Sequence, residues 1–251
     1  MKRAIKRFMF KRFKGLVQGL VLIQRIPLVL GYVLGLSVCY VIYKLTGYHR
    51  LLVTYSKVWL RYFFFINGIR LTWDKEAIDE IEGQVICANY FGPIDYAILF
   101  LILPYKKLLL MKKTFFDGGL LKKWLYLLGF YPVETDFDSH TYQSKQFRVE
   151  PYAKVGFNLV ECVHVRRQDV EPVPYSIMVA VKMGLPICFL QIKGSEWSKM
   201  ATFFTPKKVD VQISQELAPN KRPEMTLLKY RQQLEAYRPY EKARRQQIRL
   251  R

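Results

Sequence analysis

A short polar turn, NYFGPID, follows an apolar strand-like run and spans Asn89 to Asp95. Turns after strands are where α/β proteins collect their chemistry. A carboxylate such as Asp95 can orient and charge a base. Tyr90 has a side chain whose ordinary pKa is about 10, so it can donate a hydrogen bond but cannot take a proton as imidazole does. Pro-x-Asp before an apolar stretch is also a common helix start, which gives Asp95 an alternative role as an N-cap or turn residue.

The elements that must position this turn alternate between strand and helix patterns. Short apolar runs bounded by turn residues predict strands over 84–89, 106–113, 131–135, 156–165, 185–192 and 209–217. Apolar stretches with helix-start and helix-end residues predict helices over 51–69, 94–105, 115–130, 174–184 and 223–240. Strands that alternate with helices indicate an α/β fold in which helices cover the faces of a sheet.

Four stretches follow one another along the chain: NYFGPID, Lys112–Glu134, Leu159–Arg167 and Gly184–Gly194. In this order they resemble the motifs of the glycerolipid acyltransferases, the lysophosphatidic acid acyltransferase family. In that family the first motif is Asn-His-x-x-x-x-Asp, in which the His is the general base and the Asp orients and charges it. The second stretch has the family's paired lysines, aromatic-rich helix and Leu-Gly-Phe-x-Pro-Val strand.

The chain departs from this family at the residues that carry the chemistry. Tyr90 stands where the family has its catalytic His, and the arginine that follows the second motif is missing. Only Glu161 matches the third motif, Phe-Pro-Glu-Gly-Thr-Arg-Ser, and His164 stands where the Arg would be. Because the third-motif loop faces the first in this family, we hypothesise that His164 takes the role of base beside Asp95 or Glu161. The alternative is a partly buried histidine of a strand.

The resemblance implies transfer of a fatty acyl group to a hydroxyl of a lysophospholipid-like acceptor of the 1-acylglycerol-3-phosphate type. The donor is an acyl thioester, acyl-CoA or acyl carrier protein, which acts as a cosubstrate, and no metal or prosthetic group is expected. The implied site residues are Asp95 for catalysis, Tyr90 at the base position, and Asn89, Glu161, Lys112, Lys113 and Arg166 for substrate binding. The missing His leaves a second hypothesis open, a pseudoenzyme that keeps the fold and binds lipid or a protein partner.

The charge of the chain predicts a membrane partner. Among 251 residues, 40 Lys+Arg stand against 20 Asp+Glu, so the net charge is +20. An excess of this size indicates an anionic partner. The basic residues at the N-terminal end are interleaved with Phe, Met, Leu and Ile, as in segments at a lipid interface, and no nucleic-acid-binding motif is present. We therefore expect anionic membrane lipids, and no nucleic acid, as partners.

The segment Ile26–Tyr43 has 18 residues without a charge, at the lower edge of the ~17–25 residues that span a bilayer. It is expected to cross the membrane as a helix; a re-entrant hairpin and a buried helix are the alternatives. The basic residues before it indicate a cytoplasmic N-terminal end. The predicted organisation is a basic N-terminus with a membrane segment over 1–50, an acyltransferase-like domain over 51–240 at the cytoplasmic face, and a basic tail over 241–251.

Overall fold

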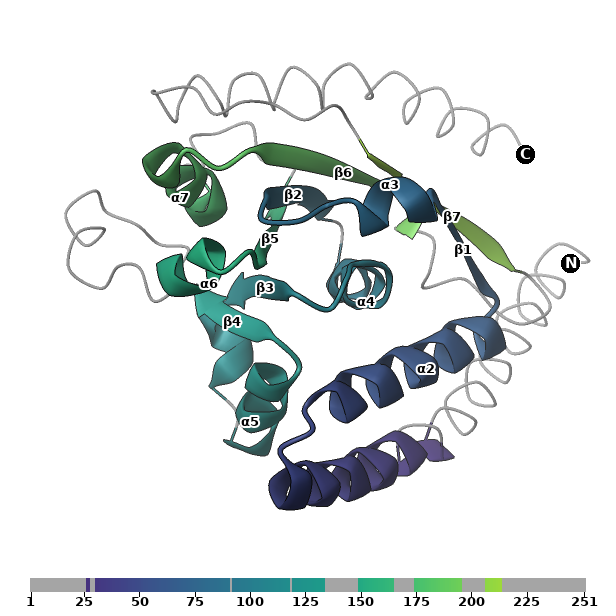
Figure 1. Ribbon diagram of the computed structural model, residues 1–251. Helices are drawn as coiled ribbons and strands as arrows, with labels where there is room; N and C mark the ends of the chain where they lie inside the picture. Colours follow the sequence, from purple (N-terminus) through teal and green to yellow (C-terminus); the bar gives the residue numbers. More distant parts are fainter. Residues whose placement is uncertain are drawn as a thin grey trace, which may run out of the picture. The chain divides into compact units, whose positions relative to one another are not determined.

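The computed structural model of the chain describes residues 26–27, 30–90, 92–117, 119–133, 149–164, 174–195 and 206–213 (Figure 1). The chain divides into two compact units, one that ends at Phe63 and one that begins at Phe64, and we describe each by itself. The predicted last helix over 223–240, the basic tail over 241–251 and the basic N-terminal end lie outside the described residues.

Within residues 30–66, two helices of the N-terminal unit pack against each other. One helix covers residues 30–46, and the other, α2 (Arg50–Ile66), runs on past the end of the unit. The Tyr32 ring stacks on the Tyr55 ring, and the Tyr55 hydroxyl donates to the Gly31 carbonyl at 3.2 Å. A Cβ atom at Gly35 would overlap the Tyr55 hydroxyl. The small residues Gly31 and Gly35 therefore let the aromatic side chains of α2 lie against the first helix.

The apolar segment of this unit differs from the sequence prediction in one respect. None of the helices within the described residues combines the length and the apolar composition that a bilayer crossing requires. The spanning helix predicted over Ile26–Tyr43 is therefore not found among them. In its place the structure has the helix over residues 30–46, which packs against α2.

In the part of the second unit that the structure describes, seven strands form one sheet with the order β1-β7-β6-β2-β5-β3-β4. The strands are β1 (Ile69–Trp73), β2 (Val85–Tyr90), β3 (Lys107–Lys112), β4 (Phe130–Val133), β5 (Asn158–His164), β6 (Ile187–Lys193) and β7 (Lys207–Ile213). Neighbouring strands are parallel, except that β6 and β7 are antiparallel. The central strands are mostly buried, as expected of a parallel sheet that helices cover on both faces.

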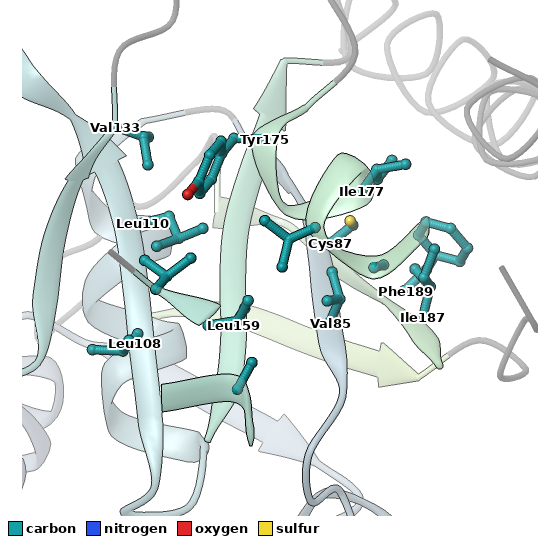
Figure 2. Packing of buried hydrophobic residues seen from close by; sticks show 14 residues of the cluster. Val85, Cys87, Leu108, Leu110, Val133, Leu159, Tyr175, Ile177, Ile187 and Phe189 are labelled. Carbon is teal, nitrogen blue, oxygen red and sulfur yellow. The ribbon is translucent and has the colours of Figure 1, made fainter. Parts of the chain in front are cut away.

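Helices connect these strands and cover the sheet. They are α3 (Lys75–Asp79), α4 (Pro93–Ile102), the 3₁₀ helix η1 (Lys113–Phe116), α5 (Gly119–Leu127), α6 (Glu150–Lys154) and α7 (Tyr175–Met183). A buried cluster joins α6 and α7 to one face of the sheet, and Figure 2 shows Tyr175 and Ile177 of α7 in it together with Cys87 of β2. On the opposite face, the Phe100 ring of α4 stacks on the Phe130 ring of β4.

The predicted α/β fold is confirmed. Each predicted strand overlaps an observed one, and the helices expected over 51–69, 94–105, 115–130 and 174–184 correspond to α2, α4, η1 with α5, and α7. Three elements of the described residues were not predicted. They are β1, which begins directly after a two-residue turn at the end of α2, and the short helices α3 and α6.

Candidate active site

The neighbouring strands β2 and β5 send the chain in opposite directions across the sheet. From β2 the chain passes through α4 to β3, whereas from β5 it passes through α7 to β6. In open α/β sheets, ligands bind outside the carboxyl ends of the strands at the point where the connections reverse in this way. The helices cover opposite faces, because Glu161 of β5 contacts α7 and the next residue, Cys162, contacts Tyr96 of α4.

The carboxylate of Glu161 caps α7 from a neighbouring strand. Its Oε2 accepts a hydrogen bond from the Ser176 backbone N–H at 2.7 Å, whereas the N-cap residue, Pro174, offers no side-chain acceptor. A negative charge is favourable at a helix N-terminus. Burial raises the pKa of the Glu161 carboxyl, and the hydrogen bonds from the backbone of Ser176 and Tyr175 oppose that rise. Glu161 therefore orders the start of α7, and its contact with substrate stays a prediction.

The carboxylate of Asp95 caps α4 from within the first turn of the helix. Its Oδ2 accepts a hydrogen bond from the Gly92 backbone N–H at 2.9 Å, and the Asp95 N–H donates to the Gly92 carbonyl at 3.0 Å. Asp95 therefore stabilises the start of the helix from its third position, whereas the N-cap residue itself is Gly92. Asp95 is fully buried, and its carboxylate raises the pKa of the Cys162 thiol on β5. A catalytic role for this carboxylate stays a prediction.

Two cysteines of the sheet lie beside these carboxylates, one on each face. The sulfur of Cys87 lies 3.7 Å from the Ser176 hydroxyl on the α7 side, and Cys162 lies on the α4 side. Desolvation raises the pKa of both thiols, and the carboxylate of Glu161 for Cys87, or of Asp95 for Cys162, raises it further. Because the thiolate is the nucleophilic form, neither cysteine is suited to act as a nucleophile here.

The side chain of Asn89 continues the pairing between β2 and β6. Backbone pairing of these strands extends to Ala88 and Leu190. Beyond it the Asn89 amide donates to the Ile192 carbonyl at 2.8 Å, and its Oδ1 accepts from the Ile192 N–H at 2.6 Å. These two bonds fix the end of β2 and so the start of the turn that leads to Asp95. Substrate binding by Asn89 stays a prediction beside this positioning role.

The structure brings most of the predicted site residues to the carboxyl ends of the parallel strands β2, β5 and β3, which lie side by side. Tyr90 and His164 are the last residues of β2 and β5, and they are paired in register. Lys112 is the last residue of β3, Lys113 is the first of η1, and both are exposed. The predicted Arg166 lies outside the described residues.

Ser176 is the member of this site that sequence reasoning missed. Its backbone N–H binds Glu161 and its hydroxyl lies beside Cys87. The available signal is Pro174, which precedes an apolar helix and carries no acceptor for the free N–H groups of the first turn. Those groups need an acceptor from elsewhere in the fold, and a buried glutamate on a nearby strand can supply it.

Comparison with solved structures finds a protein of similar fold. The chain is similar to the 1-acyl-sn-glycerophosphate (LPA) acyltransferase PlsC from Thermotoga maritima, with a TM-score of 0.50 over 74% of this chain and 78% of that chain. The sequence identity is 14%, so this likeness establishes the fold alone. No family model and no curated protein sequence matches the chain. The resemblance seen in the four motifs is thus confirmed at the level of the fold, and the chain has the α/β architecture of a glycerophosphate acyltransferase.

Proposed function

We propose that the chain transfers a fatty acyl group from an acyl thioester to a hydroxyl of a lysophospholipid-like acceptor. The donor is acyl-CoA or acyl carrier protein, and the acceptor is of the 1-acylglycerol-3-phosphate type. The observation that carries this proposal is the position of Asp95, a buried carboxylate just beyond the carboxyl end of β2, where β2 and β5 send the chain in opposite directions. The sheet concerned has the fold of an enzyme of this class.

Two lysines at the same carboxyl ends of the strands are suited to bind an acceptor that carries a phosphate. Lys112 ends β3 and Lys113 follows it, so two exposed ammonium groups lie where the adjacent strand β5 also ends. Lysine side chains bind phosphate as mobile point charges. We assign these two residues to the headgroup phosphate of the acceptor or to the phosphates of coenzyme A.

The protein acts at a membrane surface in this proposal, with its α/β unit at the cytoplasmic face. Support comes from the helix over residues 30–46, which exposes apolar side chains on one face at helical spacing: Leu30, Leu34, Val38, Val41 and Leu45. The net charge of +20 favours anionic lipid. An amphipathic acceptor is present in such a surface, so this location brings the site to its substrate.

A second candidate function, a lipid-binding pseudoenzyme, is favoured by two observations. Tyr90 occupies the position of the base in the first motif. Asp95 and Glu161 each cap a helix, so both can be retained for the fold without any catalysis. A chain that binds lysophospholipid and never turns it over would keep every contact described above.

Acyl transfer from a radiolabelled donor separates the two functions. Wild type is offered lysophosphatidic acid with acyl-CoA or acyl carrier protein donors, beside Asp95→Asn, which keeps the helix cap and removes the charge. The Lys112→Gln/Lys113→Gln variant is expected to raise the KM for the phosphate-bearing acceptor about tenfold, because charge-assisted bonds are lost. Lys106→Gln/Lys154→Gln is the matched control, since these exposed lysines precede β3 and β5 at the amino ends of the strands.

Turnover by wild type, with a strong loss in Asp95→Asn, supports the acyltransferase. Bound lysophosphatidic acid without turnover, for every donor, would support the pseudoenzyme instead. An equal change of KM in the two double-lysine variants would show that the lysines act through overall charge and not at the site.

A further inference from the structure

Tyr90 and His164 occupy paired positions on adjacent parallel strands. Neighbouring strands lie about 4.8 Å apart, so position 164 is one strand spacing from the position at which the resembling family carries its histidine. We propose that His164 of β5 is the general base of this site, in place of the residue at position 90. This inference rests on the proposed acyl transfer and adds to it the residue that accepts the proton.

The two faces of β5 decide which carboxylate can serve this base. Positions two apart in a strand lie on the same face of the sheet, so position 164 falls on the face of Cys162. That face is covered by α4, where the carboxylate of the buried Asp95 is close enough to raise the pKa of the Cys162 thiol. Glu161 lies on the other face, with its Oε2 bound to the Ser176 N–H. Asp95 is therefore the carboxylate on the side of position 164.

The reaction then balances with residues of this chain and the two substrates. The imidazole of His164 takes the proton of the acceptor hydroxyl as the hydroxyl oxygen forms a bond to the thioester carbonyl carbon. When the tetrahedral intermediate collapses, the carbon–sulfur bond breaks and the imidazolium returns the proton to the leaving thiolate. The products are the acyl ester and the free thiol, and the carboxylate of Asp95 stabilises the imidazolium that forms in between.

The pairing of positions 90 and 164 permits a test that moves the base from one strand to the other. Four proteins are compared in the transfer assay with lysophosphatidic acid: wild type, His164→Ala, Tyr90→His/His164→Ala, and His49→Ala as the control histidine of the N-terminal unit. His164→Gln is a second variant of similar size, and circular dichroism checks the fold of each protein.

We expect His164→Ala and His164→Gln to lose about 10²-fold or more in kcat with little change in KM, the usual effect of removing a general base. The added Tyr90→His is expected to restore at least a tenfold part of that loss, because it recreates a histidine followed by Asp95 at the family's spacing. Restored turnover also shows that the His164→Ala chain folds. His49→Ala is expected to turn over at the rate of wild type.

Two results would overturn the assignment, and they differ from failure of the proposed function. Turnover in both His164 variants within about threefold of wild type would remove His164 from the chemistry. Loss in both variants without any recovery in the double variant would show a structural role for His164. A folded wild type that binds lysophosphatidic acid and turns over no donor would overturn the acyltransferase itself, and this inference with it.

Discussion

The carboxylates of Asp95 and Glu161 are held by backbone N–H groups at the starts of two helices. An alanine at either position would remove the cap and the charge together, and the loss of a cap alone costs about 1 kcal/mol. Loss of activity in such a variant would not distinguish chemistry from folding. Asn at 95 and Gln at 161 keep an acceptor oxygen and remove the charge, so the amide variants are the informative ones.

For Glu161 we predict a pH-dependent gain in stability on substitution by Gln. Burial raises the pKa of this carboxyl above its ordinary 4.5, so the folded state holds the proton more tightly than the unfolded state. The free energy of unfolding of wild type therefore falls as pH rises from about 4.5 through the raised pKa, by about 1.4 kcal/mol for each unit of the shift. Glu161→Gln buries no charge and lacks this fall.

Urea unfolding at several pH values between 4 and 8 measures this effect. The difference in stability between Glu161→Gln and wild type should move in favour of Gln as the pH rises. Parallel curves over the whole range would contradict a raised pKa. Asp79→Asn is a suitable control, because Asp79 is an exposed carboxylate at the end of α3.

At the scale of elements, a buried side chain with a charge of the favourable sign lies at each end of α4. Asp95 lies in its first turn, and the buried ammonium of Lys107 lies at its end. The Lys107 Nζ donates to the carbonyls of Phe100, Leu103 and Pro104 at 2.8, 2.9 and 3.1 Å. All three protons of the ammonium group are thereby used, and the carbonyls at the end of α4 receive a donor.

We predict that Lys107→Met destabilises the protein by about 3 kcal/mol, because buried carbonyls lose a charged donor. The neighbouring Lys106→Met is the matched control. The Lys106 ammonium lies 3.1 Å from the Glu82 carboxylate, but both side chains are more than half exposed. Such a pair contributes under about 1 kcal/mol. Thermal or urea unfolding of the two variants measures the contrast, and equal losses would contradict the role given to Lys107.

The sequence predicted the strands and helices of the covered sheet because their apolar runs are bounded by turn residues. It did not predict β1, whose exposed Arg70 and Thr72 alternate with more buried neighbours and whose start is separated from α2 only by Asn67 and Gly68. That Asn-Gly pair, in which Gly68 has a φ of 66°, was the available signal of a turn. Strand order could not be predicted, because it depends on pairing between residues far apart in the chain.

The candidate site was predicted in part, and the reason is similar. Motif resemblance placed Asp95 and Glu161 in one site. The structure adds that Asp95 caps α4 and Glu161 caps α7, two helices on opposite faces of the sheet. A sequence does not show which face of a strand meets which helix when every position of that strand is buried or apolar. The register that pairs Tyr90 with His164 likewise follows from the sheet as a whole.

At the scale of the whole molecule, we predict that the apolar face of the first helix binds lipid. Leu34→Glu and Leu45→Glu, at side chains that are 68% and 81% exposed, should each weaken binding to vesicles with anionic lipid about tenfold or more, because burial of a leucine is worth about 1.5–3 kcal/mol. Binding that persists at high salt would separate apolar insertion from electrostatic attraction, which salt weakens.

Co-sedimentation with such vesicles measures the binding. Val155→Glu in the second unit is the matched control, because Val155 is an exposed aliphatic side chain at the end of α6. Equal binding by all variants, or release of the wild type by salt alone, would contradict a role of the apolar face.

The placement of β7 between β1 and β6 has a consequence for how the chain acquires its structure. The Thr72 hydroxyl of β1 donates a hydrogen bond to the Asp210 carboxylate of β7, 138 positions later in the sequence. β1 can therefore pair with β7 only after nearly all of the sheet has been synthesised. Closing so long a loop is costly in entropy and slow. Until the ribosome has released β7, β1 has no partner strand and the edge of β6 that faces β7 is unpaired. These edges are where we expect chaperones to bind, and where a chain truncated before Lys207 would aggregate.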